Sequence, residues 1–305
     1  MAPAANATLP YWGTYDHKRM LANLANMAVL DLILRPHPAR LRAYQEAFGA
    51  GGGMSQETFD QFFARYFPDG WNAGVPYYGD LDSRIAGATS VLDLGCGDNR
   101  ALARYRTAGR SVWGTDFTPH PNLFAPESFR TLSPNGTVPF PDETFDVIAS
   151  CWVLEHVREP VRYLAEVRRL LRPGGAFVSL SVNAWHYTTG ITRLLGLLPH
   201  ALTQRLVRRL YGRATHDTFP TYYRLNTPAA LRRHARQAGL DLVSLTRVAN
   251  AGYFSFSPRL YRLAVRVDWL LDRLAADLGR VYFVATLQKA SPSRASLRDA
   301  GRRAA

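Results

Sequence analysis

The stretch Val91–Gly97 (Val-Leu-Asp-Leu-Gly-Cys-Gly) constrains the fold of this chain more than any other feature. Its first half is apolar around a single acid, as in a buried strand, and two glycines follow. Glycine adopts backbone conformations that are closed to larger residues, and it lets a ligand lie against the main chain. We therefore expect a buried strand that runs into a tight, ligand-binding turn, with a helix beginning near Asn99.

The residues around this turn narrow the class of ligand. Exposed N–H groups and a helix N-terminus would favour a carboxylate or a phosphate. A dinucleotide-binding turn would carry a third glycine where this chain has Arg100. Asp93 would repel a diphosphate, but it can accept hydrogen bonds from an ammonium group. About twenty residues later Asp116 ends a second apolar run, where a carboxylate can bind two ribose hydroxyls.

Short apolar runs alternate with helical patterns over residues 86–182, which predicts a parallel sheet with crossover helices. The strands expected in this part are 91–94, 112–115, a weak one near 129–132, 145–150 and 176–182. A helix is expected over 159–171. Further along the chain we expect a helix at 227–238 capped by Thr227, a strand at 241–248, a helix at 258–274 and a strand at 281–287.

Four motifs in order resemble those of class I S-adenosylmethionine-dependent methyltransferases, of the type 11 group that includes ubiquinone and menaquinone biosynthesis enzymes. The motifs are Val91–Gly97, Gly114–Asp116, Val138–Val147 leading to Leu154–Val157, and Leu170–Gly175. They cover about residues 88–182. The resemblance implies an α/β fold with a Rossmann-like, seven-stranded, mostly parallel sheet flanked by helices. It also implies S-adenosyl-L-methionine as cofactor and methyl transfer as the reaction.

The resemblance also assigns residues to the cofactor. Asp93, Gly95 and Gly97 line the methionine end, and Asp116 holds the ribose. The remaining cofactor-binding residues implied are Cys96 in the same turn, Phe117 packed on the adenine, and Cys151 after the fourth strand. The acid that usually reads the adenine amino group is missing from the segment 133–136, where Asn135 or a backbone carbonyl could substitute.

The sequence gives fewer indications of where the substrate binds than of where the cofactor binds. Residues 1–85 are expected to form a helical cap, 86–289 the methyltransferase domain with a lid insertion at 184–226, and 290–305 a disordered tail. Aromatic residues such as Trp71, Tyr77 and Tyr78 could close the pocket. Candidate substrate-binding residues, each weighed against a purely structural role, are His156, His186, Tyr187 and Tyr223. No catalytic base is assigned, since methyl transfer mainly requires positioning and exclusion of water.

Charge and cysteine content bear on partners and compartment. The net charge is +13, and almost all of the basic residues are arginines. Such a charge on its own is weak evidence for nucleic-acid binding. No membrane-spanning segment, secretory signal, disulfide framework or metal site is predicted, so a cytoplasmic protein is expected. Helices near 202–210 and 258–274 carry arginines opposite leucines. We expect the leucines to pack inward, while peripheral contact with a membrane surface stays open.

The predicted function is methyl transfer to a small aromatic or hydrophobic metabolite, with the acceptor atom and the oligomeric state open. A nucleic-acid methyltransferase is the first alternative, but the sequence after the fourth strand, Ser150–Val153, lacks the motifs of amino-directed and cytosine-C5 DNA enzymes. An inactive cofactor-binding partner subunit is the second alternative. A nicotinamide oxidoreductase is the third, weakened by the missing glycine.

Overall fold

The computed structural model describes residues 56–70, 72–190, 221–251 and 258–291. These fall into two compact units. The sheet unit comprises the described residues within 73–182, 221–246 and 283–291, and the helical unit those within 56–72, 183–190 and 247–282. The predicted end of the cap at residue 85 differs from the boundary at residue 72 because the helix α5 (Gly74–Ile85) belongs to the sheet unit.

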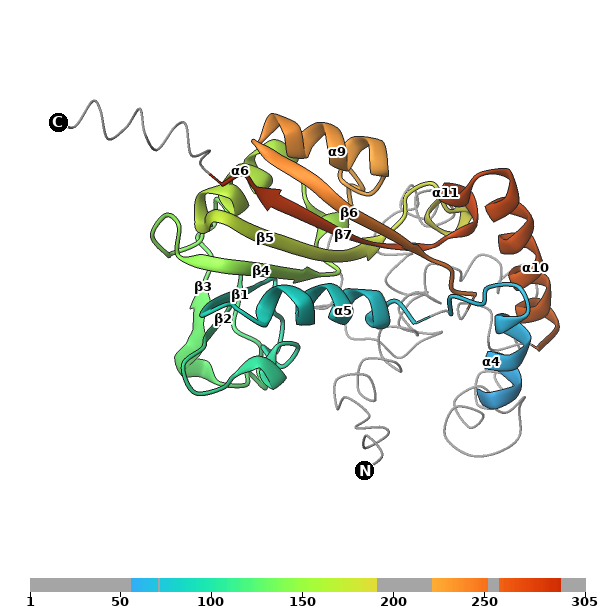
Figure 1. The fold of residues 1–305 in the computed structure, drawn as a ribbon, viewed down its shortest axis with the longest axis horizontal. Helices are drawn as coiled ribbons and strands as arrows, with labels where there is room; N and C mark the ends of the chain where they lie inside the picture. The colour runs from blue at the N-terminus through green and yellow to red at the C-terminus, as the bar shows by residue number, and fades with distance from the viewer. Residues whose placement is uncertain (1–55, 71, 191–220, 252–257, 292–305) are drawn as a thin grey trace, which may run out of the picture. The chain divides into compact units, whose positions relative to one another are not determined.

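The sheet has seven strands in the order β3-β2-β1-β4-β5-β7-β6 (Figure 1). Every predicted strand is present, and the predicted Rossmann-like α/β fold is confirmed. The bonded neighbours from β3 to β5 run parallel, whereas β7 runs opposite to β4 and β5 (Figure 1). The strands are β1 (Ser90–Leu94), β2 (Ser111–Asp116), β3 (Phe129–Thr131), β4 (Phe145–Cys151), β5 (Leu171–Val182), β6 (Leu240–Val248) and β7 (Tyr282–Lys289).

The register of the central strands brings the predicted motifs to one edge. Asp93 on β1 lies opposite Gly114 on β2 and Ala149 on β4. Because parallel strands end at the same edge of a sheet, the segments that follow β1, β2 and β4 meet there. All five residues of β1 are buried, which explains its apolar composition.

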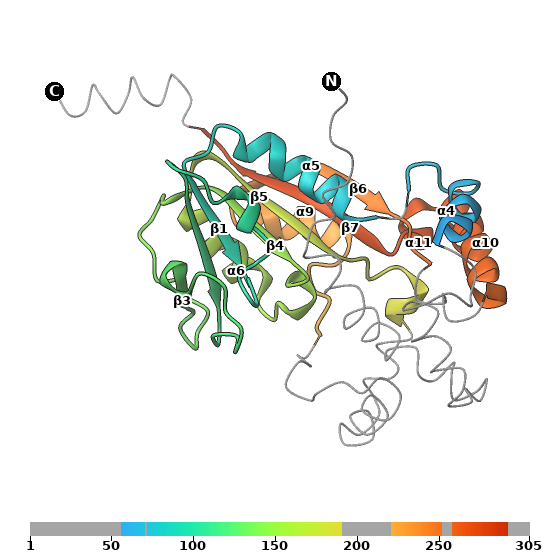
Figure 2. The ribbon, with the colours of Figure 1, turned by 90° about the horizontal axis from the view of Figure 1, so that it is seen from below.

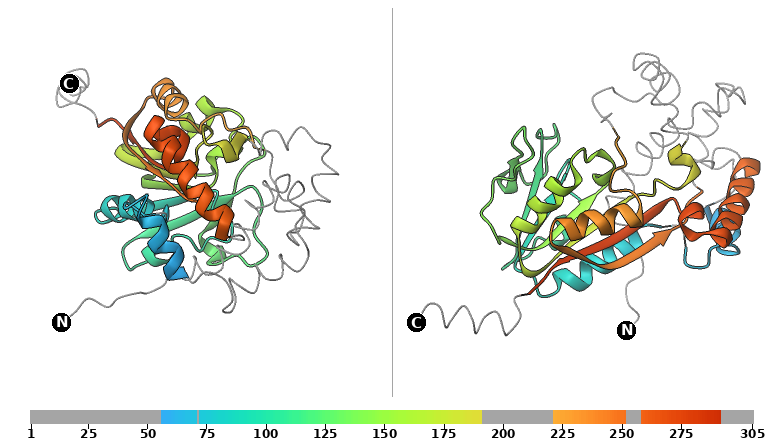
Figure 3. Two further views of the ribbon diagram at one scale, coloured as in Figure 1. Left: turned by 90° about the vertical axis from the view of Figure 1, so that its right-hand side faces the viewer. Right: turned by 90° about the horizontal axis from the view of Figure 1, so that it is seen from above.

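Helices cover both faces of this sheet. In Figures 1 and 3, α5 lies on one face, and α6 (Pro160–Leu170) and α9 (Pro228–Gln237) lie on the other. The predicted cap of α9 is confirmed, since the Thr227 hydroxyl accepts a hydrogen bond of 3.1 Å from the Ala230 N–H. Asp80 of α5 accepts hydrogen bonds from Thr286 Oγ1 (2.7 Å) and Ser244 Oγ (3.3 Å), which fix the helix against β7 and β6.

The helical unit contains α4 (Gln56–Ala64), α10 (Pro258–Leu274) and the short α11 (Ala276–Gly279). α4 lies beside α10 (Figure 2). The rings of Tyr66, just after α4, and Trp269 are 5.7 Å apart between centroids. None of the helices in the described residues is long and apolar enough to cross a bilayer. Residues 202–210 lie outside the described part of the chain.

The prediction that the leucine face of α10 packs inward is wrong for three of its residues, although Ala264 of that face is buried and Leu260 and Leu271 are half-buried. Leu263 is 55% exposed, Val267 38% and Leu274 73%, whereas Tyr261 and Asp268 are buried. Periodicity identifies an apolar stripe but does not say which side of the helix faces the core. The inward side of α10 carries Val265 and also Asp268, which contacts His186, a residue far away in the sequence.

Candidate functional site

The turn after β1 is held by the neighbouring strand β2. The N–H groups of Gly95 and Cys96 donate to the Thr115 carbonyl at 2.8 and 3.0 Å, and the Gly97 N–H donates to Asp116 Oδ2 at 3.0 Å. These three amides are therefore satisfied within the protein and are not offered to an anion, contrary to the expectation of exposed N–H groups. That arrangement agrees with the missing third glycine and disfavours a diphosphate ligand.

The helix expected to begin near Asn99 is absent. Turns follow the glycines, and the segment Ala103–Tyr105 forms a single turn of 3-10 helix, η1. Asn99 has φ +61°, a left-handed conformation that a right-handed helix cannot include. Its side-chain amide donates to the Phe124 carbonyl at 2.9 Å, and its Oδ1 accepts from Arg106 at 3.0 Å. These long-range contacts override the local pattern, so no helix dipole points into the site.

The two turn glycines differ in their surroundings. Gly95 has φ +82°, and a Cβ there would lie 2.4 Å from Val153 Cγ2, so the main chain and Val153 are in close contact. Gly97 has φ +55°, and a Cβ there would meet nothing within 4 Å. The main chain at Gly97 therefore borders open space directly beside the Asp116 carboxylate, which is where a ligand can lie against the turn.

Asp116 ends β2 with a half-buried carboxylate. Its Oδ2 accepts from Gly97 N–H and its Oδ1 from Phe117 N–H at 2.7 Å. A carboxylate oxygen has two lone-pair positions, so each oxygen retains one for a further donor. Two acceptor positions side by side fit the adjacent hydroxyls of a ribose. Phe117, 54% exposed, offers a ring next to them. The roles predicted for both residues are compatible with this geometry.

Asp93, Cys96 and Cys151 are less exposed to solvent than Phe117. Asp93 is 3% exposed, and Cys151 is half-buried. Burial raises the pKa of the Cys96 thiol, and Asp93 and Asp116 raise it further, so Cys96 is a protonated thiol and not a nucleophile. Among the described residues, no group of His, Cys, Asp or Glu side chains could hold a metal ion.

Tyr78 of α5 is a neighbour of this site. Burial raises the pKa of its phenol, and the nearby Cys151 and Asp93 raise it further. The hydroxyl is therefore neutral and donates to the Ala101 carbonyl at 3.4 Å. In the sequence Tyr78 belongs only to a cluster of aromatic residues that precedes the sheet. That pattern suggested that Tyr78 could close the pocket, but it did not predict a place beside Asp93 and Cys151, because this position depends on how α5 packs against the strands.

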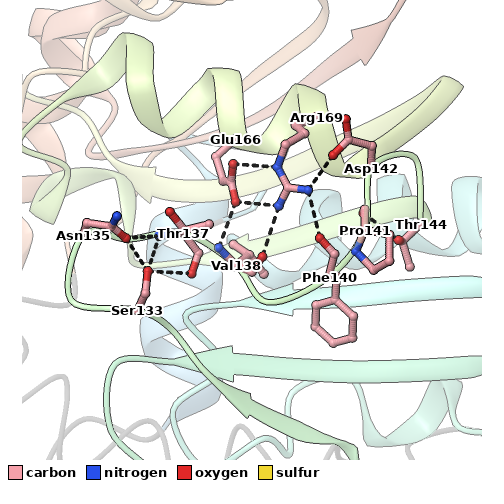
Figure 4. Close-up of polar contacts among 10 residues, drawn as sticks. All are labelled: Ser133, Asn135, Thr137, Val138, Phe140, Pro141, Asp142, Thr144, Glu166 and Arg169. Atoms are coloured by element: carbon pink, nitrogen blue, oxygen red, sulfur yellow. Dashed lines mark hydrogen bonds and ion pairs between the residues drawn. The ribbon is translucent and has the colours of Figure 1, made fainter.

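The loop between β3 and β4 does not provide a substitute for the missing acid through Asn135 (Figure 4). Asn135 Oδ1 accepts hydrogen bonds from the Ser133 hydroxyl and, at 3.1 Å, from the Thr137 N–H. The amide oxygen is thus used to close the turn. An adenine amino group needs an acceptor, so a backbone carbonyl is the remaining option of the two considered.

Arg169 of α6 fixes the rest of this loop (Figure 4). Its guanidinium donates to the carbonyls of Phe140 (2.8 Å) and Val138 (3.1 Å). It also binds Glu166 Oε1 and Oε2 at 2.7 and 2.9 Å. Burial raises the pKa of the Glu166 carboxyl, but the hydrogen bonds from Arg169 and the Val138 N–H outweigh burial and hold that pKa below its ordinary value. The motif residues 138–142 are therefore held in place by one guanidinium.

Replacing Arg169 with methionine is expected to lower the free energy of unfolding at pH 7 by about 2–3 kcal/mol, because carbonyls and a carboxylate lose a charged donor. Since the pKa of Glu166 is depressed, its stabilisation is present above the unfolded value of 4.5 and is lost as the pH falls through the folded value. The difference from wild type should shrink in acid. Urea unfolding from pH 3 to 7 tests both, with the exposed Arg162→Met as control. Equal losses in the two variants would contradict the role of Arg169.

Two of the predicted substrate residues lie at the carboxyl edge of the sheet. His156 ends the short helix η3 (Leu154–His156) after β4, and Tyr223 has φ +52°. The N–H groups of Tyr222 and Tyr223 donate to the Glu155 carbonyl at 2.7 and 3.1 Å, which joins the end of the predicted lid to this edge. Their contact with a substrate stays a prediction.

Glu155 anchors a buried network that the sequence did not single out. Ser181 Oγ donates to Glu155 Oε2 at 2.7 Å, and Asn226 Nδ2 donates to Ser181 Oγ at 2.8 Å. All three residues are buried. Their partners are 26 and 45 residues apart in the chain, so only the fold brings them together.

His186 and Tyr187 belong to the helical unit. His186 is 1% exposed; its Nδ1 lies 2.8 Å from Thr188 Oγ1 and its Nε2 lies 3.3 Å from Asp268 Oδ1 of α10. Burial raises the pKa of Asp268, and contacts with His186 and Tyr187 lower it only in part. The imidazole is thus enclosed by protein partners, which is the structural role weighed against substrate binding. A substrate contact for Tyr187 stays a prediction.

Comparison of the sequence with known proteins gives three findings. A family profile described as a methyltransferase domain matches residues 92–179. A ubiquinone biosynthesis O-methyltransferase of Thiobacillus denitrificans is 31% identical over 206 residues, which are 62% of this chain and 78% of that protein. A tRNA U34 carboxymethyltransferase of Idiomarina loihiensis is 34% identical over 124 residues, 35% of this chain and 36% of that protein.

A solved structure shows a more distant likeness. It is a SAM-dependent methyltransferase from Methanosarcina mazei, with a TM-score of 0.46 and 17% identity. The likeness covers 70% of this chain and 98% of that one.

Proposed function

The chain belongs to the class I S-adenosylmethionine-dependent methyltransferases of type 11, and from this premise we propose that its acceptor is a hydroxyl group on a small, apolar aromatic metabolite. The enzyme class and the cofactor follow from the family. The observation that supports the oxygen acceptor is the 31% identity with an O-methyltransferase over most of that protein's length.

The chain's own residues fit the cofactor. Asp116 has two acceptor positions for the ribose, and the main chain at Gly97 borders open space. When bound, S-adenosylmethionine supplies an activated methyl group on a sulfonium. The protein must hold the acceptor oxygen in line with that group and keep water out. Asp93 and Tyr78 are both buried near the carboxyl end of β1. Asp93 provides a carboxyl group there, and Tyr78 provides a neutral hydroxyl group.

A nucleic-acid acceptor is the weaker candidate. It would explain the net charge of +13. The tRNA-directed relative, however, matches only 35% of this chain, which is little more than the methyltransferase domain itself. A match of that extent supports a shared domain and not a shared acceptor.

The proposal is tested by following formation of S-adenosylhomocysteine with purified full-length protein. The acceptors are an alkyl-substituted catechol, an alkyl-substituted aniline of similar size, and unmodified tRNA. We expect turnover with the catechol, little with the aniline and none with tRNA. Asp116→Ala serves as the inactive control. Methylation of tRNA alone would replace the proposed function with the nucleic-acid alternative, and cofactor binding without turnover on any metabolite pool would support an inactive partner subunit.

A further inference from the structure

The exposed side of α10 is apolar along the length of the helix. Leu263, Val267, Leu270 and Leu274 recur at spacings of three and four residues, so they lie on one side of a helix. Leu270 is 55% exposed, as is Leu263. We refer to these four residues as the leucine stripe. A contiguous row of exposed large apolar residues, unlike single ones, marks an interaction surface.

The inward side of the same helix carries a carboxylate. Asp268 is 1% exposed and lies against His186 and Tyr187. Burying a carboxylate is costly unless it has partners, whereas burying a leucine is favourable. The helix therefore buries Asp268 beside Ala264 and Val265, while the four large apolar side chains of the leucine stripe face outward.

Arginines border the leucine stripe on one side. Successive residues of an α-helix are 100° apart around its axis. On this measure four exposed arginines lie on the same side of the stripe; in order of increasing angle from it they are Arg259, Arg266, Arg273 and Arg262. Both acids of α10 lie elsewhere on its circumference, since Asp268 is buried and Asp272 pairs with Arg280 at 2.9 Å. The ring of Trp269 lies next to this edge, with Arg273 4.1 Å above it. The outward surface of α10 is thus apolar and cationic.

The apolar and cationic character of this surface distinguishes between its possible binding partners. A second copy of the chain seated on this face would bring four arginines against four arginines, which is unfavourable. Residues 1–55 and 191–220 are each net basic, with five basic residues against three acidic ones and five against one. They are therefore not complementary in charge to the arginine edge. An anionic lipid surface is complementary to both the leucine stripe and the arginine edge. Leucine side chains can pack among the acyl chains, and arginine side chains can bind the headgroup phosphates.

We propose that α10 binds the surface of an anionic lipid bilayer, with the leucine stripe inserted among the acyl chains and Arg259, Arg262, Arg266 and Arg273 at the headgroups. The helix would lie in the plane of the interface without crossing it. This binding is separate from the choice of methyl acceptor, so vesicle binding and methyl transfer can fail independently of each other.

The test is sedimentation of the full-length protein with vesicles of phosphatidylcholine alone or mixed equally with phosphatidylglycerol. Wild type is expected to bind the mixed vesicles and not the neutral ones. Leu263→Glu/Leu270→Glu should weaken binding at least tenfold, or about 1.4 kcal/mol. The matched control is Val161→Glu/Val243→Glu, which introduces the same charge at exposed valines of the sheet unit and should bind like wild type. Binding of S-adenosylhomocysteine reports that each variant is folded.

The arginines are tested separately. Arg266→Gln/Arg273→Gln should weaken binding by about fivefold for each arginine and reduce its dependence on salt. Equal binding by wild type, both α10 variants and the control would overturn the proposal. So would a wild-type dimer in light scattering without vesicles that Leu263→Glu/Leu270→Glu converts to a monomer, because the leucine stripe would then serve self-association.

Discussion

Asp116→Ala is expected to bind S-adenosylhomocysteine about 100-fold more weakly than wild type. The carboxylate ends β2 beside the open space at Gly97, and both its oxygens retain an acceptor position. Two hydrogen bonds from ribose hydroxyls to a charged acceptor contribute about 1.5 kcal/mol each, so their joint loss is about 3 kcal/mol. Isothermal titration calorimetry with the full-length protein measures the change directly.

Two controls separate this effect from a loss of folding. Asp241→Ala removes an exposed carboxylate from β6 and should leave binding unchanged. Asp116 also accepts from the Gly97 N–H, so the free energy of unfolding of Asp116→Ala must be measured alongside. A folded Asp116→Ala protein that binds the ligand as tightly as wild type would show that the ribose is held elsewhere.

Gly95→Ala is the second large effect we expect. The residue has φ +82°, where a side chain costs about 1–2 kcal/mol. The new Cβ would also lie 2.4 Å from Val153 Cγ2. Overpacking of this kind costs about 1–3 kcal/mol more. We therefore expect a loss of about 2–5 kcal/mol in the free energy of unfolding, together with loss of cofactor binding, measured by urea unfolding and calorimetry.

The two causes can be resolved with matched variants. Gly136 has the same φ of +82° but open space around the position of a Cβ, so Gly136→Ala should show the backbone cost alone. In the background Val153→Ala, which removes the contacted methyl group, Gly95→Ala should cost less than in wild type. If Gly95→Ala and Gly136→Ala cost the same, the contact with Val153 does not limit this position.

The strands could be predicted because each is a short apolar run bounded by turn residues, as at Val91–Leu94. The cap at Thr227 followed from a local rule, since the residue that bonds to it is three positions away. Once the strands are predicted, the shared edge that holds Asp93 and Asp116 can be predicted as well, because parallel strands place their carboxyl ends together. These are the parts of the fold and of the site that depend on local sequence.

The errors depend on contacts between distant residues. The helix expected at Asn99 fails because Phe124 and Arg106 hold that residue in a left-handed conformation. The inward side of α10 is set by His186, 82 positions before Asp268 in the chain. Neither contact leaves a mark in the local pattern, and the same is true of the Glu155 network. Sequence periodicity alone cannot supply such information.

The place of β7 in the sheet has a consequence for biosynthesis. β7 lies between β5 and β6, although it is translated after both of them. Until it emerges from the ribosome, β5 presents an unpaired edge and β6 has no neighbour in the sheet. An open, apolar edge of this kind recruits other chains. Nascent chains that stall before Tyr282 should therefore be the aggregation-prone species, and clients for chaperones that shield strand edges.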